Sequence, residues 1–218
     1  MEDIQFNNKK EQFYLIGAGG LSRELECWMD RSRFSQSYEL IGYVDDNPDV
    51  LKGIVNEYKI VDGFFKGEIW KGKNIVMGIA NTDIKQKAFE LFASNNCNVL
   101  SFIHDTVLVG KNTQMGAGAV LYPRSIISCN VSVGEGVMIN AGTQVGHDVT
   151  IGNYASIMAN VDIGGGAQIG NNVFIGSKAV ILPGVKIPDG CRIGAGSVVI
   201  KSIRQVGTYF GNPAKKIF

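Results

Sequence analysis

The hexads VSVGEG, VMINAG, TQVGHD and VTIGNY, residues 131–154, show the pattern that decides the fold of this chain. The third residue of each hexad is aliphatic, the first is small or β-branched, and the fourth is often glycine. The same phase continues outward without an insertion from Val107 to Ser202. A helix repeats its apolar residues every three or four positions, so a period of six excludes one. Hexapeptide repeats are typical of β-helices, and we predict a left-handed parallel β-helix over residues 105–202.

The aliphatic third positions should all point into the interior of a three-sided prism, where each coil stacks on its neighbours. They are Val109, Met115, Leu121, Ile127, Val133, Ile139, Val145, Ile151, Ile157, Ile163, Ile169, Ile175, Ile181, Ile187, Ile193 and Val199.

Composition limits the classes of protein that the chain can belong to. The 218 residues are 45% hydrophobic, which suffices for one or two packed domains. The net charge is +1 and no lysine or arginine run is present, so no nucleic-acid surface is expected. No uninterrupted apolar stretch is long enough for a membrane span. The mixed-charge first dozen residues do not resemble a signal peptide, and four scattered cysteines without CxxC spacing fit a reduced cytoplasmic protein.

The first hundred residues have a different organisation from the repeats. Short apolar runs alternate with amphipathic segments, which is typical of a small parallel α/β domain, here called Rossmann-like. The expected strands are residues 13–16, 40–44, 74–79 and 99–103, and the expected helices are residues 21–32 and 83–94. Asn81 or Thr82 is the expected cap of the second helix, and its expected apolar face consists of Ile84, Ala88, Leu91 and Phe92. The sequence therefore predicts an α/β domain over residues 1–104 that begins with a polar leader over residues 1–12, followed by the β-helix over residues 105–202 and a tail over residues 203–218.

A glycine turn joins the first expected strand to the first expected helix. Gly19 and Gly20 end this turn, and the free N–H groups of a following helix can cradle a phosphate. The match to a dinucleotide fingerprint is incomplete, because the third glycine is replaced by Ser22. Asp45 and Asp46 end the second strand on the same sheet edge. These loops predict a ligand site at this edge, and a plain turn is the alternative for each.

His147 and Asp148 occupy a corner of the predicted prism where most hexads carry only small or amide residues. A histidine can accept and return a proton near neutral pH, and an adjacent carboxylate can orient its ring. We therefore predict that His147 is a general base and Asp148 its partner, with an exposed corner residue as the alternative. The other histidine, His104, is predicted to be structural. Two distant histidines cannot supply the three ligands of a catalytic zinc, so no metal is expected.

Small residues also follow one another at corners near the end of the repeats, and they would leave a groove for an extended thioester arm. Four lysines near this groove could contact phosphates. The alternative is that they are ordinary surface residues. They are Lys178, Lys201, Lys215 and Lys216.

These features together resemble a known family. An α/β domain with GAGG, an unbroken hexapeptide prism with a His-Asp corner and a tail reading GNPAK are similar to bacterial sugar acyltransferases of the sialic acid O-acetyltransferase family, called NeuD. That family includes N-acetyltransferases of nucleotide-linked 4-amino-4,6-dideoxy sugars. The resemblance implies a homotrimer that uses acetyl-CoA as cosubstrate, without a metal, and binds a nucleotide-linked sugar in the small domain.

The resemblance also implies roles for individual residues. His147 and Asp148 would be catalytic. Contacts to the nucleotide sugar would come from Gly19, Gly20, Leu21, Asp45, Asp46, Ala80 and Asn140. Contacts to acetyl-CoA would come from Ser156, Gly165, Ser177 and Ala195. Some members carry a second histidine where this chain has Ser156, and there it is placed to contact the thioester.

The leading interpretation is therefore an acetyl-CoA-dependent sugar N-acetyltransferase with His147 as general base. Two alternatives stay open. One is O-acetylation of a sugar hydroxyl, as in the sialic acid enzymes. The other, from a different class, is a non-catalytic β-helix trimer. Several hexads carry an apolar residue at their second position, where we expect the side chain on the prism surface. This exposed apolar surface suggests a trimer. These second-position residues are Val120, Ile126, Met138, Val180 and Val198.

Overall fold

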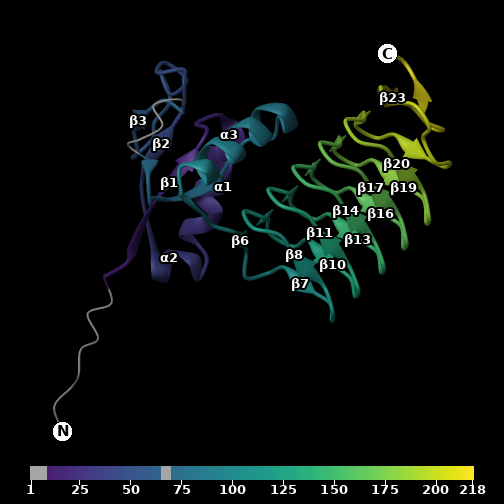
Figure 1. Ribbon diagram of the computed structural model, residues 1–218, viewed down its shortest axis with the longest axis horizontal. Helices are drawn as coiled ribbons and strands as arrows, with labels where there is room; N and C mark the ends of the chain where they lie inside the picture. The colour runs from purple at the N-terminus through teal and green to yellow at the C-terminus, as the bar shows by residue number, and fades with distance from the viewer. Residues whose placement is uncertain (1–8, 65–69) are drawn as a thin grey trace, which may run out of the picture.

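The computed structural model describes residues 9–64 and 70–218 and shows two parts, an α/β domain and a β-helix (Figure 1). The first part has a five-stranded parallel sheet in the order β3-β2-β1-β4-β5. Its strands are β1 (Glu11–Ile16), β2 (Tyr38–Val44), β3 (Ile60–Asp62), β4 (Asn74–Met77) and β5 (Asn98–Val99). Its helices are α1 (Gly20–Asp30), α2 (Phe34–Ser37) and α3 (Thr82–Ser94). The predicted α/β domain is confirmed.

The second part is a parallel β-helix with three faces, and the predicted fold is confirmed here as well. Face 1 consists of β6 (Phe102–Ile103), β9 (Val120–Leu121), β12 (Met138–Ile139), β15 (Ser156–Ile157), β18 (Phe174–Ile175), β21 (Arg192–Ile193), β23 (Thr208–Phe210) and β24 (Lys215–Lys216). Face 2 consists of β7 (Leu108–Val109), β10 (Ile126–Ile127), β13 (Gln144–Val145), β16 (Asp162–Ile163), β19 (Val180–Ile181) and β22 (Val198–Val199). Face 3 consists of β8 (Gln114–Met115), β11 (Ser132–Val133), β14 (Thr150–Ile151), β17 (Gln168–Ile169) and β20 (Lys186–Ile187).

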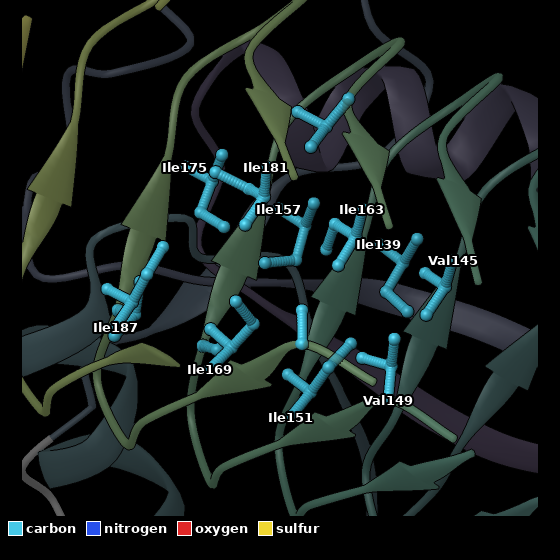
Figure 2. Close-up of a cluster of buried hydrophobic side chains, with 14 of the residues drawn as sticks. Ile139, Val145, Val149, Ile151, Ile157, Ile163, Ile169, Ile175, Ile181 and Ile187 are labelled. Atoms are coloured by element: carbon cyan, nitrogen blue, oxygen red, sulfur yellow. The ribbon is translucent and has the colours of Figure 1, made fainter. Parts of the chain in front are cut away.

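The interior of the prism explains why the hexad phase is kept. Each strand pairs in parallel with the strand one coil away, as Ile127 does with Val145. The aliphatic third positions therefore stack into columns (Figure 2), and nearly all of them are buried. Val109, in the first coil, is 46% exposed because no coil precedes it on face 2. Burial of each such side chain contributes about 1.5–3 kcal/mol, so the repeat itself stabilises the fold.

The boundary between the two parts differs from the prediction. The single strand expected at residues 99–103 is two strands, because β5 pairs with β4 of the α/β sheet while β6 pairs with β9 of the prism. The polar leader was expected over residues 1–12; β1 already begins at Glu11, and residues 1–8 lie outside the described residues. The tail is not a simple extension either, since β23 adds to face 1 beside β21 and pairs with β24 in antiparallel.

The α/β domain covers part of face 1, and this corrects one expectation. Val120 and Met138 were expected on the prism surface, but each is only 1% exposed because both pack in the apolar cluster of the α/β domain. On face 2, Ile126 is 40% exposed, and Leu108 is 64% exposed. Of the five apolar residues expected on the surface, those that stay at least partly accessible are the ones of face 2, Ile126, Val180 and Val198.

Helix α3 attaches the α/β domain to face 1 through a buried lysine. Asn81 caps this helix as expected and accepts hydrogen bonds from the N–H groups of Asp83 and Ile84. The expected apolar face is partly wrong, because Ile84 is 48% exposed while Lys85 is fully buried. The Lys85 Nζ donates to the Ala155 carbonyl oxygen at 2.9 Å and to the Ser156 Oγ at 2.7 Å. Both acceptors belong to the prism.

Burial has a clear consequence for the charge of this lysine. Loss of water around the ammonium lowers the pKa of Lys85 from its ordinary value of 10.5 to about 7. The unfolded chain then binds more protons than the folded chain between about pH 7 and pH 10.5. The free energy of unfolding should therefore rise with pH across this window.

We expect the free energy of unfolding of wild type to rise from pH 7 to pH 9 more steeply than that of Lys85→Met. The difference in slope should approach about 1.4 kcal/mol per pH unit, because one proton is involved. Chemical denaturation at several pH values measures both slopes. Subtracting the slope of Lys85→Met from that of wild type removes the contribution of the other titratable groups. Equal slopes would show that Lys85 keeps its ordinary pKa in the folded chain.

Candidate functional site

His147 and Asp148 lie together at the corner between faces 2 and 3, which follows β13 and precedes β14. The Nδ1 atom of His147 and the Oδ2 atom of Asp148 are 2.7 Å apart. A carboxylate can only accept, so Nδ1 carries a proton, and in the neutral form of the ring Nε2 is then the acceptor. The hydrogen bond from His147 is the largest cause that lowers the pKa of Asp148. The side chains are 66% and 58% exposed, so a ligand can reach the pair.

Gly165 lies one coil further along the same corner, directly beside the imidazole. A Cβ atom at this position would be 2.6 Å from Nε2 of His147. Any side chain at residue 165 would therefore push the ring out of place. The sequence assigned Gly165 to the thioester arm, and the structure places its backbone next to the proposed base.

The glycine turn lies at the carboxyl end of β1, as expected for a phosphate cradle. Gly19 is the N-cap of α1 and no side chain caps this helix. Gly20 is exposed, and a Cβ at Gly19 would meet nothing within 4 Å. The start of α1 is therefore open, with its N–H groups and the positive end of the helix dipole accessible to an anion.

The missing third glycine of the fingerprint has a structural explanation. Ser22 is only 1% exposed, and its hydroxyl donates to the Gly78 carbonyl oxygen at 2.9 Å. A Cβ at Gly78 would lie 2.3 Å from the Ser22 Oγ. The close approach of helix and sheet that the third glycine permits is achieved here by a glycine after β4.

Asp45 and Asp46 lie at the end of β2 beside the glycine turn. One carboxylate oxygen of Asp45 accepts from the N–H of Ala18 at 2.8 Å, and the other accepts from the N–H of Asn47 at 2.9 Å. Asp46 accepts from the N–H of Phe64 at 2.7 Å. Both aspartates line a cavity of about 850 Å³, a volume within the range of ligand sites. The sequence did not identify five further polar residues of this cavity, Lys52, Asn56, Tyr58, Lys59 and Asp62.

Leu21, Ala80 and Asn140 lie where the α/β domain meets the corner between faces 1 and 2. The Leu21 carbonyl oxygen accepts from the Tyr122 hydroxyl at 3.1 Å, and Ala80 packs in the same apolar cluster as Tyr122. Asn140 is 7% exposed and follows β12. Ser177 and Ala195 occupy the same corner in later coils, since they follow β18 and β21.

One chain therefore holds the predicted site residues other than Ser156 in two groups. The predicted sugar contacts, Ser177 and Ala195 belong to the α/β domain and the corner between faces 1 and 2. His147, Asp148 and Gly165 belong to the corner between faces 2 and 3. Face 2 lies between the two groups. A single chain does not bring the histidine to the predicted sugar site.

Ser156 is in neither group, because it lies on face 1 under helix α3. It is fully buried, and its hydroxyl oxygen accepts a hydrogen bond from Lys85. A contact between Ser156 and the thioester stays a prediction.

The remaining sequence candidates are peripheral. His104 is 8% exposed, and its Nδ1 atom is bonded to the Thr106 hydroxyl at 2.9 Å, as expected of a structural residue. Lys201 and Lys216 line a cavity of about 470 Å³ near the carboxyl end of the prism. Over residues 9–64 and 70–218, no group of three histidine, cysteine or acidic side chains could hold a metal, and no helix is long and apolar enough to cross a membrane.

Comparison with known proteins assigns both parts of the chain. Residues 12–92 match the PglD N-terminal domain, and residues 130–165 and 166–201 match the bacterial transferase hexapeptide, six repeats. The acetyltransferase domain of PglB from Neisseria gonorrhoeae FA1090 has a TM-score of 0.84 at 24% identity, covering 95% of this chain and 100% of that one. It has also been solved in complex with acetyl coenzyme A. No curated protein sequence matches the chain.

A second solved structure is similar over the same length. PerB from Caulobacter crescentus, in complex with CoA and GDP-perosamine, has a TM-score of 0.77 at 21% identity, covering 94% of this chain and 96% of that one. At these identities the likenesses establish the fold. The fold defines a hexapeptide-repeat β-helix protein with an N-terminal parallel α/β domain. The chain is thus similar to the PglD N-terminal domain over residues 12–92 and to bacterial transferase hexapeptide repeats over residues 130–201.

We expect Gly165→Ala to lower the rate of any reaction that uses the His147 ring by about tenfold or more, because the added methyl group displaces Nε2. The fold should persist, since the crowded atom belongs to an exposed side chain. The double variant Gly165→Ala, His147→Ala is the control and should be no slower than His147→Ala alone. An undiminished rate in Gly165→Ala would contradict the assignment of this corner.

Proposed function

We propose that this chain is an acetyl-CoA-dependent N-acetyltransferase that acts on a nucleotide-linked 4-amino-4,6-dideoxy sugar. The observation that carries the proposal is the exposed His147–Asp148 pair, whose geometry leaves Nε2 as a proton acceptor at a corner lined by glycine. The fold shared with PglB and PerB, solved with acetyl-CoA and with CoA and GDP-perosamine respectively, supports the choice of substrates.

The chemistry follows from the residues at this corner. Nε2 of His147 takes a proton from the sugar amine as nitrogen attacks the thioester carbonyl. Asp148 holds the protonated Nδ1 edge of the ring and stabilises the imidazolium that forms. A backbone N–H of the glycine-rich corner, at Gly165, faces the developing oxyanion. Collapse of the tetrahedral intermediate breaks the carbon–sulfur bond, and the CoA thiolate leaves with the proton returned by His147. No covalent acyl-enzyme is required.

The nucleotide is assigned to the α/β domain. The open start of α1 at Gly19, Gly20 and Leu21 would bind the diphosphate, and the cavity beside Asp45 and Asp46 would receive the rest of the nucleotide. Ala80 and Asn140 lie at the adjoining corner, toward which the sugar would extend. Ser177 and Ala195, at successive coils of that corner, would contact the thioester arm.

This arrangement requires more than one chain. We propose a cyclic homotrimer in which the His147 corner of one chain faces the α/β domain and the Asn140 corner of its neighbour. The separation of the two residue groups by face 2 supports this, as does the exposed apolar surface on face 2 at Leu108 and Ile126. Acetyl-CoA would then lie between neighbouring prisms.

His147→Ala should lower kcat by about 10²–10⁴-fold with acetyl-CoA binding preserved, because general-base help is lost. Asp148→Asn should cost less, since the ring remains. Release of free thiol from acetyl-CoA, measured with a panel of UDP-, GDP- and dTDP-linked amino sugars and matching hydroxyl sugars, checks this and separates N- from O-transfer. If wild type acetylates no sugar of either panel, a non-catalytic trimer is favoured. If His147→Ala keeps near-normal turnover, His147 is not the general base.

Mixed assemblies test the shared site. Gly20→Val blocks the open start of α1 and His147→Ala removes the base, so each variant alone should be nearly inactive. In random co-assembled trimers about a quarter of the sites should combine an intact His147 corner with an intact neighbouring turn, and activity should return to about that fraction. Co-assembled trimers that stay inactive would place both groups in one chain.

A further inference from the structure

A column of three polar side chains runs along the corner that carries His147. Asn112, Asn130 and Asp148 occupy equivalent positions in three successive coils, with 18 residues between neighbours. All three have a left-handed backbone, with φ of +59°, +57° and +60°. This conformation suits asparagine and aspartate better than other residues with a side chain. The Nδ2 atom of Asn112 donates to Oδ1 of Asn130 at 3.1 Å, and Nδ2 of Asn130 donates to Oδ1 of Asp148 at 3.1 Å.

The direction of these hydrogen bonds is fixed by chemistry. An ionised carboxylate has no proton to give, so Asn130 must turn its NH₂ group toward Asp148. Its carbonyl oxygen then faces Asn112, which must in turn present its own NH₂ group. The charge of Asp148 therefore orients both amides, and the amides in return hold the carboxylate.

The two oxygens of Asp148 have separate partners. Oδ1 accepts from Asn130, and Oδ2 accepts from Nδ1 of His147. With one oxygen held by Asn130, rotation of the carboxylate about its last bond is restricted. This matters because His147 and Asp148 are both exposed, and water competes for every polar atom of the pair. The hydrogen bond from Asn130 also contributes to the lowered pKa of Asp148, after that from His147.

We propose that Asn130, held in turn by Asn112, is a positioning residue for acetyl transfer. It fixes the carboxylate of Asp148 so that Nδ1 of His147 keeps its proton and Nε2 points at the acceptor amine. The proposal rests on the proposed function for its catalytic meaning, while the orientation of the ring can be measured without any reaction.

A matched control exists on another corner of the same prism. Asn171 donates through Nδ2 to Oδ2 of Asp189 at 3.1 Å, again 18 residues apart, and no histidine is attached to this pair. If polar columns only stabilise corners, deleting either asparagine should have the same effects. If Asn130 positions the base, only the loss of Asn130 should change the tautomer of His147.

The test uses Asn130→Gly, because glycine accepts the left-handed backbone and removes only the amide. Asn171→Ala is the control. Imidazole ¹⁵N shifts, recorded at a pH where the ring is neutral, report which nitrogen of His147 carries the proton, and the His147→Ala spectrum separates its signals from those of His104. We expect Asn130→Gly to populate the tautomer with the proton on Nε2, and Asn171→Ala to leave the ring unchanged.

Kinetics give the second readout. Asn130→Gly should lower kcat by about 3- to 30-fold with KM for acetyl-CoA unchanged, a range expected for one solvent-exposed hydrogen bond that acts on the base through a second residue. In an Asp148→Asn background the same change should add almost nothing, because the two residues act through one contact. A smaller effect is expected for Asn112→Gly.

An unchanged tautomer population in Asn130→Gly, or equal kinetic losses in Asn130→Gly and Asn171→Ala, would overturn the inference. Absence of acetyl transfer by wild type would instead overturn the proposed function, and the ¹⁵N shifts would still decide whether Asn130 orients the ring.

Discussion

The stacking of parallel strands at a constant spacing of one coil is the constraint on which the rest of this structure depends. Each coil presents an aliphatic side chain to the interior on every face, and these side chains form continuous columns. The backbone of one coil hydrogen-bonds to the next, as the N–H of Gly146 does to the carbonyl oxygen of Ile163 at 2.8 Å. Insertion of a single residue would move interior side chains to the surface, so the chain can vary only where it turns. The polar chemistry of the β-helix is therefore concentrated at its corners.

A corner repeated in every coil offers a straight row of positions, and two rows carry the candidate site. One row holds the histidine and its polar support, and the other meets the α/β domain at Asn140. The two rows are separated because they lie along the two edges of face 2, and a three-sided prism cannot bring two of its edges together. The proposed trimer resolves this geometry, since a rotated copy brings unlike corners side by side. The Lys85 contact has a related role, because it fixes the α/β domain to face 1, next to only one of the two rows.

The sequence predicted the fold well because the hexad phase and the alternation of strands and helices are local signals. The cap at Asn81 and the pairing of His147 with Asp148 are also local, and both are present. The predictions failed where long-range contacts decide. Val120 and Met138 carry no signal that a distant domain will cover them, and a lysine among apolar helix positions gives no warning of burial. The role of Asn130 could have been found, because its spacing of 18 residues from Asp148 is visible once the coils are aligned.

The structure of the protein with a CoA thioester analogue and a nucleotide-linked amino sugar would test the central claim most directly. The account predicts the acceptor amine within hydrogen-bond distance of the unprotonated Nε2 of His147 from one chain, with the nucleotide at the open start of α1 of its neighbour. A thioester bound away from the His147 corner, or a nucleotide and a histidine brought together by the same chain, would contradict it.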